Sequence, residues 1–446
     1  MSSPDALSLL DDLIRNARRA GADAADAVLV EGVSLSYAQR LGCTEKLERS
    51  ESFDVGLRVF FGKHQAIVSS NDRRAERLRE LVERAIAMAK AVPEDPYCGL
   101  ADPADITREW PALDLVDDVE ASPDVLIARA ATAEDAARAV PGVTNSEGAE
   151  ASWQRSQLAI VASNGFAGSY VGTGHSVSVS VVTGEGAGME RDYDYTSTIH
   201  ASDLRDPAEV GRRAGERAVR RLGARKVPTC QVPVVYDPRV APSLLGHFIG
   251  AISGTAIARG TSFLKDKHGE HVFAAGITII DDPHRRRGLR SRPFDGEGIA
   301  PQRRAIVDDG VLTTWLLDLA SSRQLGLKTT GHAARGTSSP PSPSPTNLWL
   351  APGPVTAGEL IGDIPRGLYV TELMGMGVNG VTGDYSRGAA GFWIENGALA
   401  YPVSEITIAG NLKDMYRHLT AANDLEFKTG IDTPTLRIDG MTIAGT

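Results

Sequence analysis

The sequence predicts an α+β protein with an N-terminal α/β domain containing long helices and a strand-rich C-terminal domain of mixed or antiparallel sheets. Helical and strand-like periodicities alternate through the first 225 residues, whereas strands and turns dominate afterwards. The chain has 446 residues, 42% of them hydrophobic and 23% charged, which is enough for two or three folded domains. We therefore expect domains at residues 1–225 and 226–446, with a further sub-boundary near 95–122.

The N-terminal domain is predicted by apolar residues that recur first at helical and then at strand spacing. Glycine at position 62 marks the turn of a predicted β-hairpin over residues 54–70. The helices are expected at residues 5–20, 72–91, 123–140 and 206–223, and the other strands at 25–40, 151–163 and 168–186. A Pro- and Asp-rich connection without periodicity fills residues 97–118.

The C-terminal domain is predicted by short strands separated by turn residues. Asp309-Gly310 and Asn396-Gly397 are dipeptides that favour tight hairpins. The Ser/Pro-rich segment 336–347 predicts an extended surface loop or flap that does not pair in a sheet. We expect strands within 276–283, 303–317, 366–374, 391–403 and 404–410, a helix at 411–424 and a last strand at 434–445.

Charge and cysteine content exclude several classes of partner. A net charge of −10 disfavours nucleic acid, because binding to phosphates needs clustered Lys and Arg. Cys43, Cys98 and Cys230 lie far apart, so neither a disulfide framework nor a thiolate zinc site is indicated. The N-terminus lacks signal-peptide features and no apolar run is long enough for a membrane span. We expect a cytoplasmic protein without nucleic-acid or membrane partners.

Nucleotide-binding patterns are weak or absent in this sequence. The segment "GMGVNG" at 375–380 satisfies G-x-G-x-x-G, but a hairpin rather than a helix follows it. A dinucleotide site needs the glycines to lead into a helix N-terminus that meets the pyrophosphate. Neither a P-loop nor a G-x-S-x-G elbow occurs in the sequence.

The segment "LLGHFIGAISG", residues 244–254, predicts a buried helix with a single histidine. A zinc peptidase helix needs two ligands one turn apart and a carboxylate that activates water. His247 is followed at the matching spacings by Gly250 and Ala251, and no Asp or Glu occurs between positions 237 and 266. We expect His247 to be hydrogen-bonded in or near a core.

Other polar residues are candidates for binding. His268, Glu270 and His271 cluster in a predicted loop, where a third ligand is missing. The segment 382–393, predicted as a loop, places Asp384, Tyr385 and Arg387 between glycines. Either these side chains contact a peptide or partner, or the segment is a turn in which Asp384 and Ser386 cap neighbouring backbone groups. His332 stands alone and is either a structural hydrogen-bonding residue or part of the same binding surface.

The second half resembles the PmbA/TldE family, also known as "modulator of DNA gyrase" proteins, and specifically its TldE-type subunits. The resemblance runs at least from residue 232 to 424. It is carried by "SLLGHFIGAISG", "DDPHRRRGLRSRPFDGEG", "DDGVLTTWLLDLASSRQLGLKTTGHAARG", "VTELMGMGVNGVTGDYSRGAAGFWIENG" and "YPVSEITIAGNLKDM".

The resemblance implies a noncatalytic subunit. TldD proteins carry a metal-binding H-E-x-x-x-H helix, and its three functional positions correspond here to Gly246, His247 and Ala251. TldD also uses a cysteine near its C-terminus, whereas the last cysteine here is Cys230. The family implies a heterodimeric protease for unfolded or short peptides, in which a TldD-type partner supplies zinc. This chain would then hold no cofactor and no catalytic residue.

Two alternatives stay open at this point. One is a stand-alone metallopeptidase with an unusual ligand set drawn from the chain's histidines, namely His247, His268, His271 and His332. The other is a non-proteolytic interaction module that modulates a topoisomerase. Metal content and the identity of the co-purifying partner separate these hypotheses.

Overall fold

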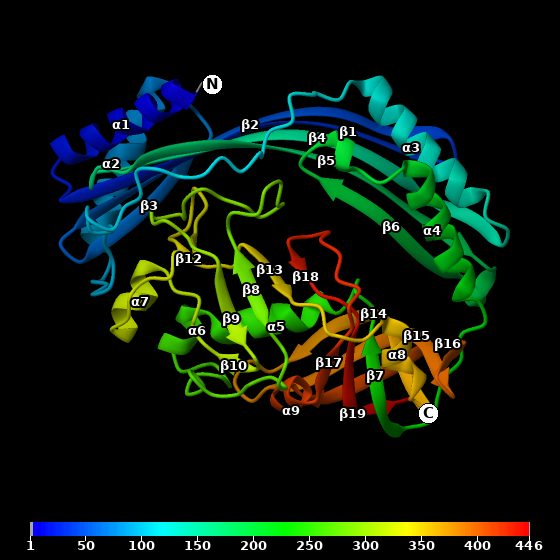
Figure 1. The fold of residues 1–446 in the computed structure, drawn as a ribbon. Coiled ribbons are helices and arrows are strands. Elements are labelled where there is room, and N and C mark those ends of the chain that lie inside the picture. Colours follow the sequence, from blue (N-terminus) through cyan, green and yellow to red (C-terminus); the bar gives the residue numbers. More distant parts are fainter. Residues whose placement is uncertain (1–2, 446) are drawn as a thin grey trace.

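The computed structural model describes residues 3–445 and shows an arched sheet above a strand-rich C-terminal half (Figure 1). Within these residues the arched sheet has six strands in the order β3-β2-β1-β4-β5-β6, each antiparallel to its neighbours. They are β1 (Ala24–Arg40), β2 (Cys43–Phe61), β3 (His64–Ser70), β4 (Val143–Ala162), β5 (Ala167–Thr183) and β6 (Glu190–Thr198). The predicted hairpin over 54–70 is confirmed by β2 and β3.

Helices cover the outer, convex face of the arched sheet at its two ends (Figure 1). They are α1 (Ser3–Arg19), α2 (Ala75–Ala91), α3 (Pro123–Arg138) and α4 (Pro207–Arg220). Successive strand residues point to opposite faces, so Ala25, Ala27 and Leu29 pack beneath α1 and α2. Val177 and Val179 of β5 pack in the same way beneath α3 and α4. The even-numbered side chains of these strands therefore face the C-terminal half.

The C-terminal half contains two mixed sheets. The larger one has the order β16-β15-β14-β7-β19-β17, and an added pairing of β16 with β19 curls it toward a barrel. Its strands are β7 (Cys230–Tyr236), β14 (Arg366–Val378), β15 (Asp384–Glu395), β16 (Ala398–Asn411), β17 (Leu419–Ala421) and β19 (Leu436–Ala444). The predicted α+β class is confirmed, because helices and several sheets are both present.

The smaller sheet has the order β10-β9-β8-β13-β18, and a short hairpin, β11 with β12, lies beside it. These strands are β8 (Ile279–Asp282), β9 (Arg304–Asp308), β10 (Val311–Leu312), β13 (Asn347–Leu350), β18 (Ile431–Asp432), β11 (Ala333–Ala334) and β12 (Ser342–Pro343). The helices of this half are α5 (Pro242–Ile252), α6 (Gly254–Ala258), α7 (Leu319–Leu325), α8 (Ala357–Gly362) and α9 (Leu412–Arg417). No helix within residues 3–445 is long and apolar enough to cross a membrane.

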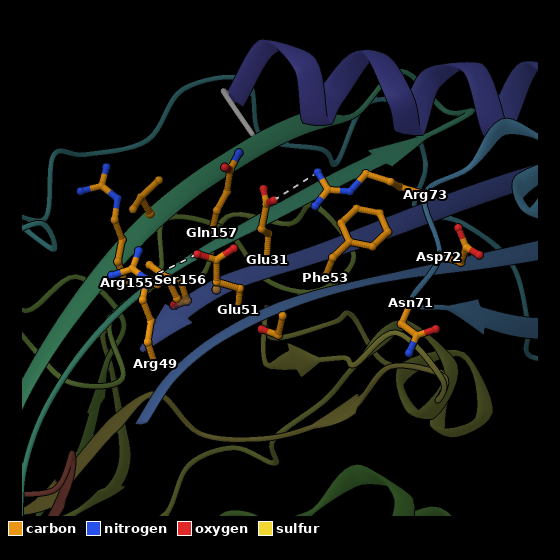
Figure 2. A pocket seen from close by; sticks show the side chains of 14 residues that line it. Glu31, Arg49, Glu51, Phe53, Asn71, Asp72, Arg73, Arg155, Ser156 and Gln157 are labelled. Carbon is orange, nitrogen blue, oxygen red and sulfur yellow. Dashed lines mark ion pairs between the residues drawn. The ribbon is translucent and has the colours of Figure 1, made fainter. Parts of the chain in front are cut away.

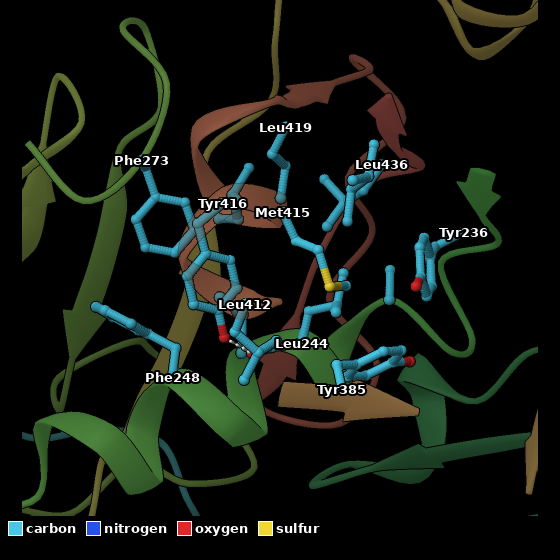
Figure 3. Close-up of a cluster of buried hydrophobic side chains, with 14 of the residues drawn as sticks. Tyr236, Leu244, Phe248, Phe273, Tyr385, Leu412, Met415, Tyr416, Leu419 and Leu436 are labelled. Atoms are coloured by element: carbon cyan, nitrogen blue, oxygen red, sulfur yellow. Dashed lines mark hydrogen bonds between the residues drawn. The ribbon is translucent and has the colours of Figure 1, made fainter. Parts of the chain in front are cut away.

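A core of large side chains joins α5 and α9 to the curled sheet (Figure 3). Tyr416 is central to it: its ring stacks on Phe273 at a centroid distance of 4.5 Å, and its hydroxyl donates to the Leu244 carbonyl at 2.9 Å. Buried tyrosine hydroxyls need such a partner. This bond fixes α5, the predicted single-histidine helix, against α9.

Three predictions about local structure were wrong. The helix predicted over 411–424 ends at Arg417, because the following residues form β17 and pair with β19. The segment 382–393 is not a loop, since nearly all of it belongs to β15. The Ser/Pro-rich segment 336–347 does pair in a sheet, because Ser342 and Pro343 form β12 opposite β11.

The start of the Ser/Pro-rich segment attaches the C-terminal half to the arched sheet. Arg335 forms an ion pair with the buried carboxylate of Asp26 at 2.8 Å, and Arg58 of β2 binds the same carboxylate. Two residues later, Thr337 hydrogen-bonds Asp54. A Cβ at Gly56 would lie 2.0 Å from the Thr337 carbonyl oxygen, so β2 needs glycine at this close approach.

Candidate functional site

Helix α5 packs one face into the core and exposes two glycines on another. Pro242 occupies the first turn, where its missing N–H costs nothing, and Leu244, Leu245 and Phe248 are buried. Gly246 and Gly250 lie one helical turn apart on the exposed side, and a Cβ added at either position would meet no atom within 4 Å. This surface of α5 therefore presents backbone rather than side-chain donors.

His247 is half-buried beside the curled sheet. Its ring meets Tyr385 edge-on at a centroid distance of 5.9 Å, and its Nε2 atom is buried without a hydrogen-bond partner. The expectation of a hydrogen-bonded histidine is therefore wrong for this nitrogen. Burial lowers the pKa of His247, and the positive charge of Arg387 lowers it further, so the neutral imidazole is favoured at pH 7.

Strand β15 divides the three polar residues that the sequence singled out. Asp384 is exposed, where its carboxylate accepts from Thr382 Oγ1 at 2.6 Å and from Asn411 Nδ2 at 3.0 Å. Tyr385 is only 2% exposed and belongs to the core. Arg387 lies on the same face as Tyr385, two residues along the strand. The structure thus brings Tyr385 and Arg387 to His247, and leaves Asp384 on the opposite face.

A cavity of about 380 Å³ lies beside Arg387 and reaches from α5 to the arched sheet. Ser243 and Thr371 also line it, and Thr371 sits at a bulge of β14 with its hydroxyl buried and unpartnered. The cavity's three other arginines already have partners: Arg221 pairs with a glutamate of β14 at 2.6 Å, Arg239 with an aspartate of β6 at 2.7 Å and Arg191 with a glutamate of β4 at 3.5 Å. Arg387, whose Nε is buried without a partner, is thus available to hold an anionic or carbonyl group.

Sequence reasoning missed Ser243 and Thr371. Neither belongs to a recognisable motif, and Thr371 faces the cavity because of the bulge in β14 rather than because of its position in the strand alternation. The pairing of β14 with β15 brings Thr371 next to Arg387, and the packing of α5 places Ser243 beside the same cavity.

The residues of α5 do not fit a zinc ion. Zinc requires three or four N, S or O ligands, but Gly246 and Ala251 have no donor side chain, and Arg387 places a positive charge next to His247. Across residues 3–445, no group of three or more His, Cys, Asp and Glu side chains is arranged to hold a metal. We therefore derive no chemical step through a metal in this chain.

The remaining histidine candidates lie apart from this site. The ring centroids of His268 and Trp315 are 5.6 Å apart. Glu270 forms an ion pair with Lys267. His332 is buried, with Nδ1 at 2.8 Å from Thr330 Oγ1 and Nε2 at 3.3 Å from an aspartate oxygen of β8. His332 therefore has hydrogen-bonding partners inside the protein, as expected for a structural residue.

Comparison with known proteins identifies relatives along almost the whole chain. Family models of the PmbA/TldA metallopeptidase match residues 25–89 (domain 1), 117–222 (central domain) and 229–445 (C-terminal domain). The chain is 40% identical to the metalloprotease PmbA of Escherichia coli O157:H7, over 95% of this chain and 92% of that protein. It is 38% identical to a PmbA homologue of Haemophilus influenzae, over 96% of this chain and 94% of the relative.

Solved structures share the fold. A proposed modulator of DNA gyrase from Bacteroides thetaiotaomicron superposes with a TM-score of 0.90 at 29% identity, over 98% of each chain. TldE from Thermococcus kodakarensis superposes with a TM-score of 0.87 at 21% identity, over 98% of this chain and all of that one. The fold and the relatives define a metallopeptidase-like protein. More particularly, the chain belongs to the PmbA/TldD metallopeptidase family, which confirms the resemblance found in the sequence.

Proposed function

We propose that this chain is the noncatalytic, TldE-type subunit of a heterodimeric zinc metalloprotease that degrades or matures unfolded or short peptides. The observation that carries the proposal is the set of residues in α5, Gly246, His247 and Ala251, to which the family resemblance assigns the positions of the TldD metal site. Gly246 and Ala251 have no side chain that can bind a metal, and His247 lies next to the positively charged Arg387. A TldD-type partner would supply the zinc and the hydrolytic step.

The cavity beside α5 supports a role in holding peptide. Arg387 and Thr371 offer a guanidinium and an unpartnered hydroxyl, which can donate to carbonyl and carboxylate groups, while the Ser243 hydroxyl donates to the Val240 carbonyl and can accept from a peptide N–H. In this proposal Arg387 and its neighbour Tyr385 position part of the peptide, while Asp384, on the opposite face of β15, contacts the partner. We place the complex in the cytoplasm, with no nucleic-acid or membrane partner.

The test measures zinc and peptidase activity in the purified chain, in a TldD-type protein and in their mixture. We expect activity in the mixture, with zinc bound by the TldD-type protein. His247→Ala in this chain should leave the activity of the mixture unchanged, whereas substitution of the first histidine ligand in the TldD-type protein should abolish it. One tightly bound zinc per molecule of this chain, together with peptide cleavage by the chain alone, would overturn the proposal.

A further inference from the structure

A second cavity, which we call the central cavity, lies between the inner face of the arched sheet and the C-terminal half. Its volume is about 560 Å³, within the range of pockets that hold small ligands. Strands β4 and β5 form one wall, and the loop before β9 forms the facing wall with Arg290 and Arg292. The site described above, beside α5, has a different set of lining residues.

The two arginines of the central cavity have no carboxylate partner among the described residues. Arg290 donates from Nε to the Thr346 carbonyl at 3.1 Å. Its Nη1 makes no hydrogen bond to any described residue. Arg292 donates from Nη1 and Nη2 to backbone carbonyls of residues 333 and 344, both at 3.0 Å, and its Nε is buried without a partner. Both guanidinium groups are therefore held in place while donors remain unused.

The nearby carboxylates Asp281 and Asp295 act on these charges without forming an ion pair with either arginine. Among the described residues that line the central cavity there is no Asp or Glu. Both carboxylates accept hydrogen bonds from other groups. Asp281 accepts from Thr346 and His332, and Asp295 accepts from three backbone N–H groups. Arg290 is exposed and Arg292 is half-buried, so an anionic ligand can reach both guanidinium groups and form charge-assisted hydrogen bonds with them.

The larger hollow on the outer face of the arched sheet provides a contrast (Figure 2). It measures about 820 Å³, and its lining contains three acidic side chains and three arginines. Arg73 lies 3.9 Å from Glu31, and Arg49 lies 3.5 Å from Glu51, as the dashed lines in Figure 2 mark. The acidic and basic side chains of that hollow are therefore balanced in number, whereas no acidic side chain among the lining residues balances the two arginines of the central cavity.

The wall opposite the arginines has no Asp, Glu, Lys or Arg, and small residues form part of it beside larger ones such as Gln154, Tyr170 and His175. Ser152 and Ser176 face each other across β4 and β5 with their hydroxyl oxygens 2.7 Å apart, and Gly172 and Gly174 continue the wall along β5. A single small anion at the arginines would leave this wall to water. An extended chain would use both walls, because its backbone amides can bond the hydroxyls while its charged groups reach the guanidiniums.

We propose that the central cavity binds an acidic peptide segment, with Arg290 and Arg292 holding its carboxylates and the Ser/Gly wall of β4 and β5 contacting its backbone. This is a binding activity of the chain itself and does not depend on the proposed TldD-type partner.

The test is isothermal titration calorimetry of the full chain with the peptide acetyl-Ala-Glu-Ala-Glu-Ala-amide and with its Gln counterpart. The loss of one charge-assisted hydrogen bond reduces affinity by about tenfold or more, so the Glu peptide should bind at least about tenfold tighter at low salt. Raising the salt concentration should remove part of this difference, because exposed charge interactions are screened.

A matched pair of variants tests the location of binding. A Cβ at Gly172 would meet no atom closer than the Leu115 carbonyl oxygen at 3.9 Å, so a side chain can be added there without a backbone clash. Gly172→Glu places a competing carboxylate in the cavity and should abolish binding of the Glu peptide, whereas Gly172→Gln should preserve most of it. Arg290→Gln should weaken binding about tenfold, and Arg417→Gln, on the exposed end of α9, should not.

Each result of these titrations either supports or overturns the proposal. Preference for the Glu peptide, lost in Gly172→Glu and kept in Gly172→Gln, supports the proposal, whether or not Arg290→Gln folds. Equal affinity for the Glu and Gln peptides, or equal effects of the two Gly172 variants, would overturn it. Inorganic phosphate that binds as tightly as the Glu peptide, with the same dependence on Arg290, would also overturn it by indicating a small-anion site.

Discussion

Replacing Glu297 with glutamine should remove a pH dependence that is built into the junction of the two halves. Glu297 is buried near Asp295, so two carboxylates compete for the same surroundings. Asp295 accepts three backbone N–H groups, from residues 297, 299 and 333, whereas Glu297 accepts only one, from Leu319. Burial and the nearby Asp295 raise the pKa of Glu297 from 4.5 to about 8.

The sign of the effect follows from proton binding. Between pH 4.5 and 8 the folded chain keeps the proton of Glu297 and the unfolded chain loses it, so stability falls as pH rises through this window. Relative to a side chain that stays protonated in both states, Glu297 lowers the free energy of unfolding by about 1 kcal/mol at pH 5 and about 4 kcal/mol at pH 8. Glutamine carries no titrating proton, and its amide oxygen can still accept the Leu319 N–H.

Urea unfolding at pH 5 and pH 8 measures the prediction. Glu297→Gln should raise the free energy of unfolding relative to the unmodified chain, and this gain should be about 3 kcal/mol larger at pH 8 than at pH 5. Glu83→Gln, an exposed position on α2, serves as the control and should show no such difference. If Glu297→Gln has the same effect on the unfolding free energy at both pH values, Glu297 does not hold the proton and the reasoning fails.

Three further substitutions test other contacts. Asp26→Asn leaves two buried guanidiniums unpaired and should cost about 3–5 kcal/mol in urea unfolding, more than Arg335→Met, which leaves one ion pair intact; an equal cost would contradict this. Gly56→Ala collides with the Thr337 carbonyl, so it should lower stability by about 1–3 kcal/mol and expose segment 336–347 to proteinase K, as followed on gels. His247→Phe removes a buried, unpartnered nitrogen and should raise the Tm in calorimetry, and a fall in Tm would show that this nitrogen is satisfied in solution.

The periodicity of the N-terminal residues was sufficient to predict most elements of the arched sheet. Strands of 17 to 20 residues keep the alternation of faces over a long window, and helices α3 and α4 begin after the N-cap residues Ser122 and Asp206. What the alternation does not encode is the partner of each face. The pairing of β1 with β4, more than a hundred residues away, depends on tertiary contacts.

The glycine-rich segment of β15 was predicted wrongly because glycine has low strand propensity. In the structure these glycines permit close packing rather than a turn: a Cβ at Gly391 would lie 1.9 Å from the Tyr369 carbonyl oxygen of the neighbouring strand. The need for glycine arises only when β14 and β15 pair, so no local pattern reveals it.

The two cavities were equally hidden in the sequence. Arg387 was singled out by its glycine-flanked segment, but the partners that line its cavity come from α5 and the bulge of β14. Arg290 and Arg292 follow a basic run and look like solvated surface residues. Only the folding of the C-terminal half beneath β5 places them opposite a wall of serines and glycines.

The contact between Thr337 and Asp54 has a consequence for how the chain folds. These residues are 283 positions apart, and they seal the inner face of a sheet whose strands are complete by residue 198. During synthesis the arched sheet therefore emerges long before the segment that covers Asp26 and Gly56. Such a high contact order slows folding and leaves a charged, glycine-lined surface open meanwhile. The rate at which residues 335–337 dock would set the time during which this surface of the nascent chain needs protection from aggregation.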